Sequence, residues 1–78
     1  MDLKQTLTDI AKAIVDTPDA VVVEEVEEGD EVTLTLKVAE DDTGMVIGRH
    51  GKIAKEIRTL MRAVAAKQGK RISVDIVD

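Results

Sequence analysis

The segment Gly48–Gly51, with the sequence Gly-Arg-His-Gly, has the residue types and spacing to bind a phosphate group. Its glycines allow a sharp backbone turn and let another backbone approach closely. Lys52 and Ile53 are expected to open a helix whose unpaired backbone N–H groups point back toward the loop, an arrangement that favours anions. Arg49 offers a charged fork, and His50 offers an N–H donor. The sequence therefore predicts an anion site at this loop.

Basic side chains continue from the loop into the segment that follows it. Lys52 and Lys55 lie within one helical turn of the loop and are the better candidates for phosphate contact. At about 100° per residue, Lys55, Arg58 and Arg62 fall within about 60° of one another and form a basic stripe on a helix. Arg62 and Lys67 are more simply explained as part of a solvated helix face.

Charge is divided unevenly along the chain. The net charge is −5, but residues 1–43 hold 3 basic and 13 acidic side chains, whereas residues 44–78 hold 8 basic and 3 acidic. Charges farther apart than about 8 Å are largely screened at physiological salt. A basic patch on this acidic protein is therefore still able to attract phosphate, while the acidic part is expected to weaken nonspecific binding.

The composition argues against catalysis and against bound metals or cofactors. The chain has no cysteine, which excludes thiolate nucleophiles, thiolate metal sites and disulfides. His50 is the single histidine, so neither a metal ligand set nor a general base is expected there, and Ser73 is the single serine. No motif places a nucleophile beside a base. We expect no catalytic residues, no metal, no cofactor and no small-molecule substrate.

The length of 78 residues predicts one domain over residues 1–78, because a second hydrophobic core does not fit in so short a chain. With 44% hydrophobic and 35% charged residues, the composition is that of a folded protein. No apolar stretch approaches the ~20 residues of a membrane helix, and no targeting segment is visible. A cytoplasmic location without membrane association is expected.

Hydrophobic periodicity predicts six elements. A helix is expected over residues 3–15, strands over residues 20–27 and 31–38, a short helix ending at Gly48, a longer helix after Gly51, and a strand over residues 71–77. The segment Glu40–Asp42 is expected to cap the short helix and to supply acids to its first turn. Gly69 is expected to close the longer helix. The resulting order is α-β-β-α-α-β.

Two patterns leave the direction of particular side chains to be tested. The longer helix is expected to bury one stripe of residues, namely Ile53, Ile57, Leu60, Met61 and Val64. In the first strand, three consecutive valines at positions 21 to 23 do not decide which of them face inward.

The loop and the element order together resemble a known family. The run Ile47-Gly48-x-x-Gly51-x-Ile53, followed by Ile57, resembles the signature of the KH domain, which clamps about four nucleotides with a GxxG loop. The order of elements is similar to the prokaryotic, or type II, arrangement. Within it, the chain looks most like the small stand-alone bacterial KH proteins of the KhpA type.

This resemblance implies an α+β type II KH domain with a three-stranded mixed sheet and helices packed on one face. Residues 31–38 and 71–77 would be parallel neighbours. It also implies a noncatalytic single-stranded RNA-binding protein, acting as an RNA chaperone or post-transcriptional regulator. The apolar residues beside the loop would form the groove floor under the bases. The residues expected to contact RNA are Gly48, Arg49, His50, Gly51, Lys52, Lys55, Val46, Ile47 and Ile53.

Affinity for RNA is expected to be modest. The chain has no Phe, Tyr or Trp, so the stacking on aromatic rings that contributes about 1–3 kcal/mol per base elsewhere is not available. Micromolar binding, or about 8 kcal/mol, is the expected order of magnitude for one copy. Tighter binding would need a homodimer or a heterodimer with another KH-domain protein.

Two other functions fit part of the pattern. Two helices joined by a glycine turn also describe a DNA-binding helix-turn-helix module, although Lys52 and Ile53 are poor base-reading residues for the start of a recognition helix. The acidic first half of the chain is also compatible with a protein-interaction module.

Overall fold

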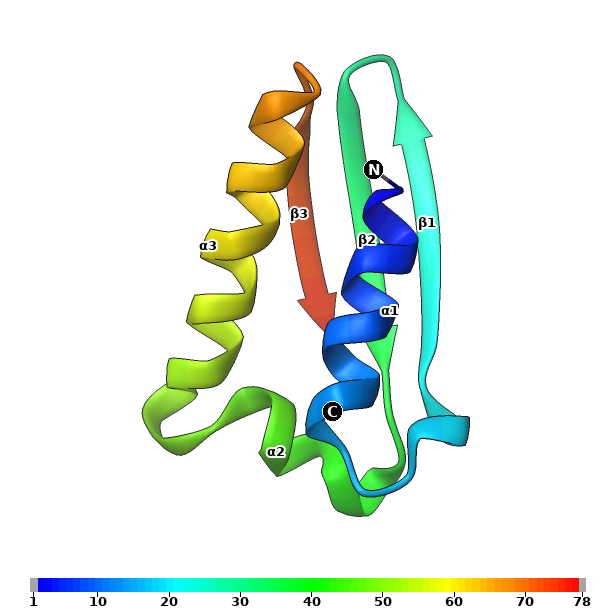
Figure 1. The fold of residues 1–78 in the computed structure, drawn as a ribbon, viewed down its shortest axis with the longest axis vertical. Helices are drawn as coiled ribbons and strands as arrows, with labels where there is room; N and C mark the ends of the chain where they lie inside the picture. Colours follow the sequence, from blue (N-terminus) through cyan, green and yellow to red (C-terminus); the bar gives the residue numbers. More distant parts are fainter. Residues whose placement is uncertain (1, 78) are drawn as a thin grey trace.

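The structure is a computed structural model that describes residues 2–77, so residues 1 and 78 of the predicted domain lie outside the described residues. The predicted order α-β-β-α-α-β is confirmed (Figure 1). The helices and strands are α1 (Leu3–Ile14), β1 (Val22–Glu28), β2 (Glu31–Lys37), α2 (Thr43–Ile47), α3 (Lys52–Lys67) and β3 (Arg71–Ile76). Short 3₁₀ turns lie at Pro18–Ala20, Glu40–Asp42 and Arg49–Gly51.

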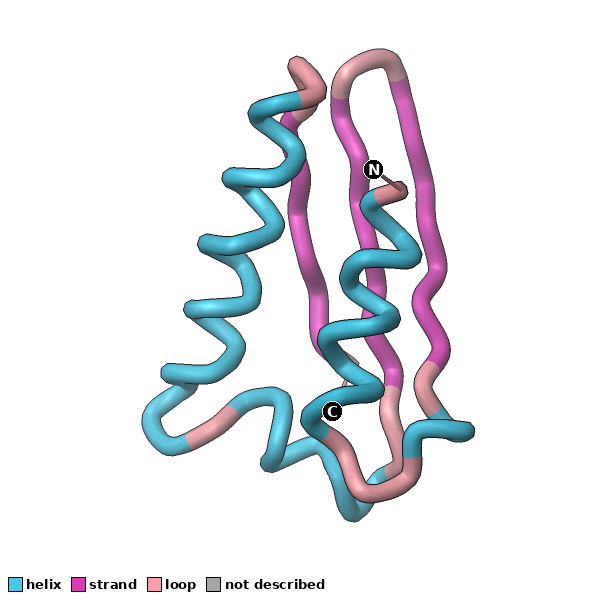
Figure 2. Tube along the Cα trace, in the orientation of Figure 1, coloured by secondary structure: helices cyan, strands magenta, loops and turns pink. Residues whose placement is uncertain are grey.

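The three strands form one mixed sheet in the order β1-β2-β3 (Figure 2). β1 and β2 form an antiparallel hairpin in which Val23 lies opposite Leu36. β2 and β3 are parallel, with Glu31 opposite Arg71. α1 packs on β1, and α3 packs along β3. The predicted α+β fold with a three-stranded mixed sheet is therefore confirmed.

One face of the sheet is buried under the helices, and the other is open. Leu34 and Leu36 of β2 are fully buried, whereas Val22 and Val26 of β1 are 50% and 58% exposed. The valine register that the sequence left open is thus settled, since Val23 faces the core and Val22 faces outward. Each fully buried leucine contributes about 1.5–3 kcal/mol relative to an exposed one.

The inward face of α3 differs from the predicted stripe at one position. Leu60, expected in the core, is 50% exposed, while Met61 is fully buried. Consecutive residues are separated by about 100° around a helix, and placing Met61 at the centre of the inward face turns Leu60 toward solvent. The buried positions of α3 are Ala54, Ile57, Met61 and Ala65. Placing Leu60 in the core was therefore wrong.

The predicted end of α3 at Gly69 is confirmed. Gly69 has a φ of +71°, a left-handed conformation that glycine adopts at little cost. Its N–H donates to the Ala66 carbonyl at 3.0 Å, and the Lys70 N–H donates to the Ala65 carbonyl at 3.0 Å. These are the paired bonds of a Schellman motif, and they turn the chain directly into β3.

The predicted capping role of Glu40–Asp42 is wrong. This segment forms a 3₁₀ turn of its own, and the Asp42 side chain makes no capping bond to α2. Asp42 is 3% exposed, and its carboxylate accepts a hydrogen bond from the Thr17 backbone N–H at 2.9 Å. It therefore ties the α1–β1 connection to the start of α2.

Replacing Asp42 by alanine should leave the Thr17 N–H without its acceptor and lower the free energy of unfolding by about 1–3 kcal/mol. Asp42→Asn should cost less, because the amide oxygen still accepts a hydrogen bond. Urea denaturation followed by circular dichroism measures both. Asp41→Ala, which removes the same charge from the exposed neighbour, is the control. Equal stability of D42A and D41A would contradict this role.

Candidate nucleic-acid interface

The turn between α2 and α3 has a geometry that demands glycine at its first position. Gly48 has φ +76° and ψ 174°, a region essentially restricted to glycine. A Cβ atom added there would lie 2.3 Å from Cγ1 and 2.8 Å from Cβ of Ile53. The backbone of Gly48 therefore packs directly against the first turn of α3.

The second half of the loop is left-handed. His50 has φ +57° and ψ +25°, and Gly51 has φ +72°. No atom lies within 4 Å of a Cβ added at Gly51, so its requirement for glycine is conformational rather than steric. A histidine held in this conformation costs of order 1–2 kcal/mol. Such strained residues are concentrated at binding sites.

Two of the backbone donors expected to face a ligand are used inside the turn. The Gly51 N–H donates to the Gly48 carbonyl at 3.1 Å, and the Lys52 N–H donates to the Arg49 carbonyl. What the loop presents outward is its side chains, since Arg49 and His50 are both exposed. The partial positive charge at the start of the 16-residue α3 adds to them.

The apolar residues around the loop are buried to different degrees. Ile47 and Ile53 are half-buried, so each exposes part of its side chain. Val46 is fully buried in the core. Contact with a ligand would therefore fall to Ile47 and Ile53.

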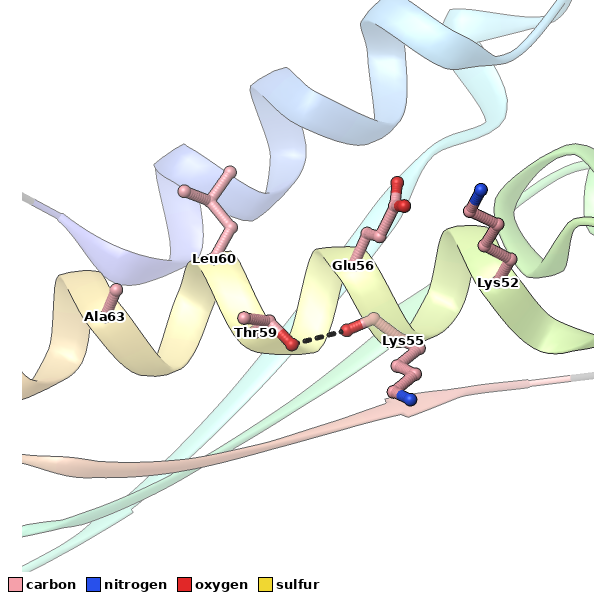
Figure 3. Close-up of a pocket in the computed structure, with 6 residues that line it drawn as sticks. All are labelled: Lys52, Lys55, Glu56, Thr59, Leu60 and Ala63. Carbon is pink, nitrogen blue, oxygen red and sulfur yellow. Dashed lines mark hydrogen bonds between the residues drawn. The ribbon is translucent and has the colours of Figure 1, made fainter.

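The two lysines nearest the loop point in different directions. Figure 3 shows Lys52 on the side of α3 that also carries Glu56 and Leu60, while Lys55 leaves the helix on the opposite side. Both lysines are exposed. Lys55 thus lies on the face that carries Arg58 and Arg62, at about 100° per residue.

Arg58 makes a structural contact that the helical spacing of the basic residues does not predict. Its Nε donates to the Val74 carbonyl of β3 at 2.9 Å, and β3 is an edge strand. The bond satisfies a backbone acceptor on the open edge and fixes α3 beside it. Arg58 is half-buried, whereas Arg62 one turn later is exposed. We call the line from Lys55 through Arg58 to Arg62, along β3, the α3–β3 seam.

Charge is divided in space as well as in sequence. The α3–β3 seam lies at one edge of the sheet, and the glutamate-rich β1 forms the other edge. Among residues 2–77, no three His, Cys, Asp or Glu side chains converge in a way that could hold a metal ion. In the same residues, no helix has the length and apolarity needed to cross a bilayer.

The fold is similar to part of the protein Era. A variant of Aquifex aeolicus Era bound to GDP·AlF4⁻ matches 95% of this chain with a TM-score of 0.68 and 19% identity, over 29% of its own length. Era in complex with MgGDPNP and nucleotides 1506–1542 of 16S ribosomal RNA matches with a TM-score of 0.69, over 28% of its length. At 19% identity, the likeness concerns the fold alone.

Sequence comparison goes further than the fold. RNA-binding protein KhpA of Clostridium acetobutylicum is 51% identical over 75 residues, covering 96% of this chain and 100% of the relative. The KhpA protein of Caldanaerobacter subterraneus subsp. tengcongensis is 52% identical over 68 residues, or 87% and 91% of the two chains. A sequence profile described as KhpA/KhpB, KH domain, matches residues 4–76. The chain therefore belongs to the KhpA/KhpB family of KH-domain proteins.

Proposed function

We propose that this protein is a noncatalytic single-stranded RNA-binding protein that grips the sugar-phosphate backbone with the loop Gly48–Gly51. The geometry of the loop is the observation that carries the proposal. The loop begins at a position that accepts only glycine, and it presents the exposed side chains of Arg49 and His50 at the start of α3. Relatives named RNA-binding protein KhpA support it. A role as an RNA chaperone or post-transcriptional regulator, in the cytoplasm, is part of the proposal.

In this proposal each part of the site has its own task. The Arg49 guanidinium pairs with a phosphate in two-pronged geometry, and His50 donates a hydrogen bond to the same backbone. Lys55 attracts the next phosphate along the α3–β3 seam, while Lys52 acts from the other side of the helix. The exposed parts of Ile47 and Ile53 form an apolar floor for one or two bases. Without aromatic stacking, specificity rests on hydrogen bonds to base edges.

A DNA-binding helix-turn-helix module fits the geometry less well. The first turns of a recognition helix present side chains to base edges, but here Ile53 is half-buried and Ala54 is buried. Two of the residues at the start of α3 are thus directed wholly or partly toward the core. An acidic protein-interaction module has only the exposed glutamates of β1 in its favour.

We further propose self-association through the outer face of α3. Leu60 is 50% exposed, and two shallow hollows, of about 540 and 420 Å³, meet at Leu60 and Ala63. If two copies of α3 pair antiparallel about the midpoint of Leu60 and Ala63, Glu56 of one copy lies opposite Lys67 of the other. Such a self-complementary patch is what a twofold dimer needs. Lys55 leaves α3 on the side opposite Leu60 (Figure 3), but it also borders the larger hollow. The contact would therefore cover the edge of each seam at Lys55 and leave the rest of the seam open, as would another KH-domain protein as partner.

The first prediction about RNA binding tests the loop. Replacing Arg49 and His50 together by aspartate puts negative charge where phosphate oxygens should lie, and aspartate tolerates the left-handed conformation at position 50. RNA affinity should fall tenfold or more, since about 1.4 kcal/mol suffices for that factor. Stability should change by no more than ~0.5 kcal/mol per site. RNA titration and thermal melting measure the two effects.

The matched control for this variant is R49Q/H50N, which removes the Arg49 charge and the His50 ring without adding repulsion and should weaken binding less. A folded R49D/H50D protein with unchanged RNA affinity would show that the loop is only a helix connection. Loss of folding would show that the two side chains are structural.

The second prediction concerns salt. Two to three phosphate contacts imply a log–log slope of affinity against salt of about −1.5 to −2 for a single strand. Titration of single-stranded RNA and of duplex DNA at several salt concentrations measures this slope and the preference between them. Equal affinity for duplex DNA would favour the helix-turn-helix alternative.

The third prediction concerns assembly. Leu60→Glu should abolish self-association, because it buries an unpaired charge in the proposed contact. Sedimentation at micromolar concentration should show the wild type above the 8.5 kDa of one chain and the variant at it. Val26→Glu changes a 58% exposed valine on the open sheet face and should leave the assembly intact. A monomeric wild type, or equal behaviour of the two variants, would refute the α3 contact.

A further inference from the structure

The far end of the α3–β3 seam carries two more cations, and both are paired with acids of the β1–β2 hairpin. Lys70 and Arg71 lie in the connection from α3 to β3 and at the start of β3. The Lys70 ammonium donates a hydrogen bond to the Glu27 carboxylate. An Arg71 Nη atom lies 3.1 Å from a Glu31 carboxylate oxygen.

These cations border a hollow that continues the seam. A hollow of about 260 Å³ between α3 and β3 is lined by Arg62, Ala66, Lys70, Arg71 and Ile72. Arg62 is the last cation of the seam, so the hollow lies where a strand running from the loop along α3 would arrive. The 16 residues of α3 span about 24 Å. A strand that contacts both the loop and the hollow must therefore be longer than the segment that the loop alone contacts.

Glu27 and Glu31 hold the side chains of Lys70 and Arg71 toward the β1–β2 hairpin. Glu27 belongs to β1, which is separated from β3 by β2, a distance of about 10 Å across the sheet. The bond therefore draws the Lys70 ammonium across the sheet. The hydrogen bond that Lys70 donates to Glu27, helped by the nearby charges of Glu25 and Asp30, raises the pKa of Lys70 above its ordinary value.

We infer that Lys70 and Arg71, together with Arg62, form a second phosphate-contact site that Glu27 and Glu31 occupy in the free protein. Its ligand class is the phosphodiester backbone of a nucleic-acid strand longer than the four or so nucleotides that a GxxG loop clamps. The inference rests on the proposed function, because it extends the path of the same strand. In the free protein the two carboxylates occupy the positions that phosphates would take, and they thereby limit the length of nucleic-acid strand that the protein binds.

Replacing the carboxylate partner of Lys70 or Arg71 by a phosphate group should change the free energy only slightly. Exposed ion pairs contribute little to stability. The Arg71 and Glu31 side chains are 80% and 66% exposed, and the Lys70 and Glu27 side chains are 30% and 41% exposed. A phosphate group offers the same charge and hydrogen-bond acceptors as the carboxylate that it displaces. Removing the carboxylates should therefore expose the site without unfolding the protein.

The test compares E27Q/E31Q with wild type in titrations with mixed-sequence single-stranded RNA of about four and about eight nucleotides. The variant should bind the longer RNA about three- to tenfold more tightly at low salt, with a log–log salt slope steeper by about 1.4 for two added phosphates. Its affinity for the shorter RNA should stay unchanged. Adding K70Q/R71Q should cancel the gain, whereas K70Q/R71Q alone should leave the affinity for the shorter RNA, which does not reach these cations, unchanged.

The control variant E24Q/E28Q removes the same charge from two exposed glutamates on the outward side of β1. Equal gains for E24Q/E28Q and E27Q/E31Q, or no gain for the latter, would overturn the second site. Thermal melting by circular dichroism checks that each variant is folded. R49D/H50D in the same titrations separates the two proposals. If it loses binding while E27Q/E31Q gains nothing, only the second site fails, and if wild type binds neither RNA, both fail.

Discussion

The close approach of the Gly48 backbone to Ile53 is the constraint on which the interface depends. A Cβ at this position would overlap the Ile53 side chain, so the missing side chain sets how near the loop lies to the first turn of α3. With that contact fixed, the exposed side chains of Arg49 and His50 stand next to the positive end of α3. The left-handed conformation at His50 is a local cost that the fold tolerates at this turn.

α3 combines three separate surfaces in one helix. Its inward face packs into the core through Ala54, Ile57, Met61 and Ala65. A second face, with Lys55 and Arg58, lies along β3, and the Arg58 bond to the Val74 carbonyl holds it there. A third face exposes Leu60. Because the faces diverge around the helix axis, the proposed strand path and the proposed self-association would use different sides of α3, which meet only at Lys55.

The acidic hairpin gives the molecule an electrostatic gradient. Its glutamates stand at the sheet edge opposite the seam, except at the tip, where Glu27 and Glu31 reach Lys70 and Arg71. The negative charge of these glutamates, so close to the proposed RNA site, would discourage long nonspecific contacts with polyanions. In the proposed mode, one copy of the protein binds a short RNA segment mainly through its phosphates, and multivalency raises the affinity.

The sequence by itself determined the order of elements, the glycine loop and the end of α3 at Gly69, because each depends on local periodicity or on a φ that glycine alone adopts readily. It also indicated Arg49, His50 and Lys55 as the exposed cationic or donor side chains near the loop. Only the tertiary structure decided that Leu60 faces outward, that Asp42 binds Thr17, and that Arg58 binds β3. The direction in which a helix faces its core is set by what packs against it. Hydrogen bonds between residues 25 or 16 positions apart likewise exist only once the fold brings them together.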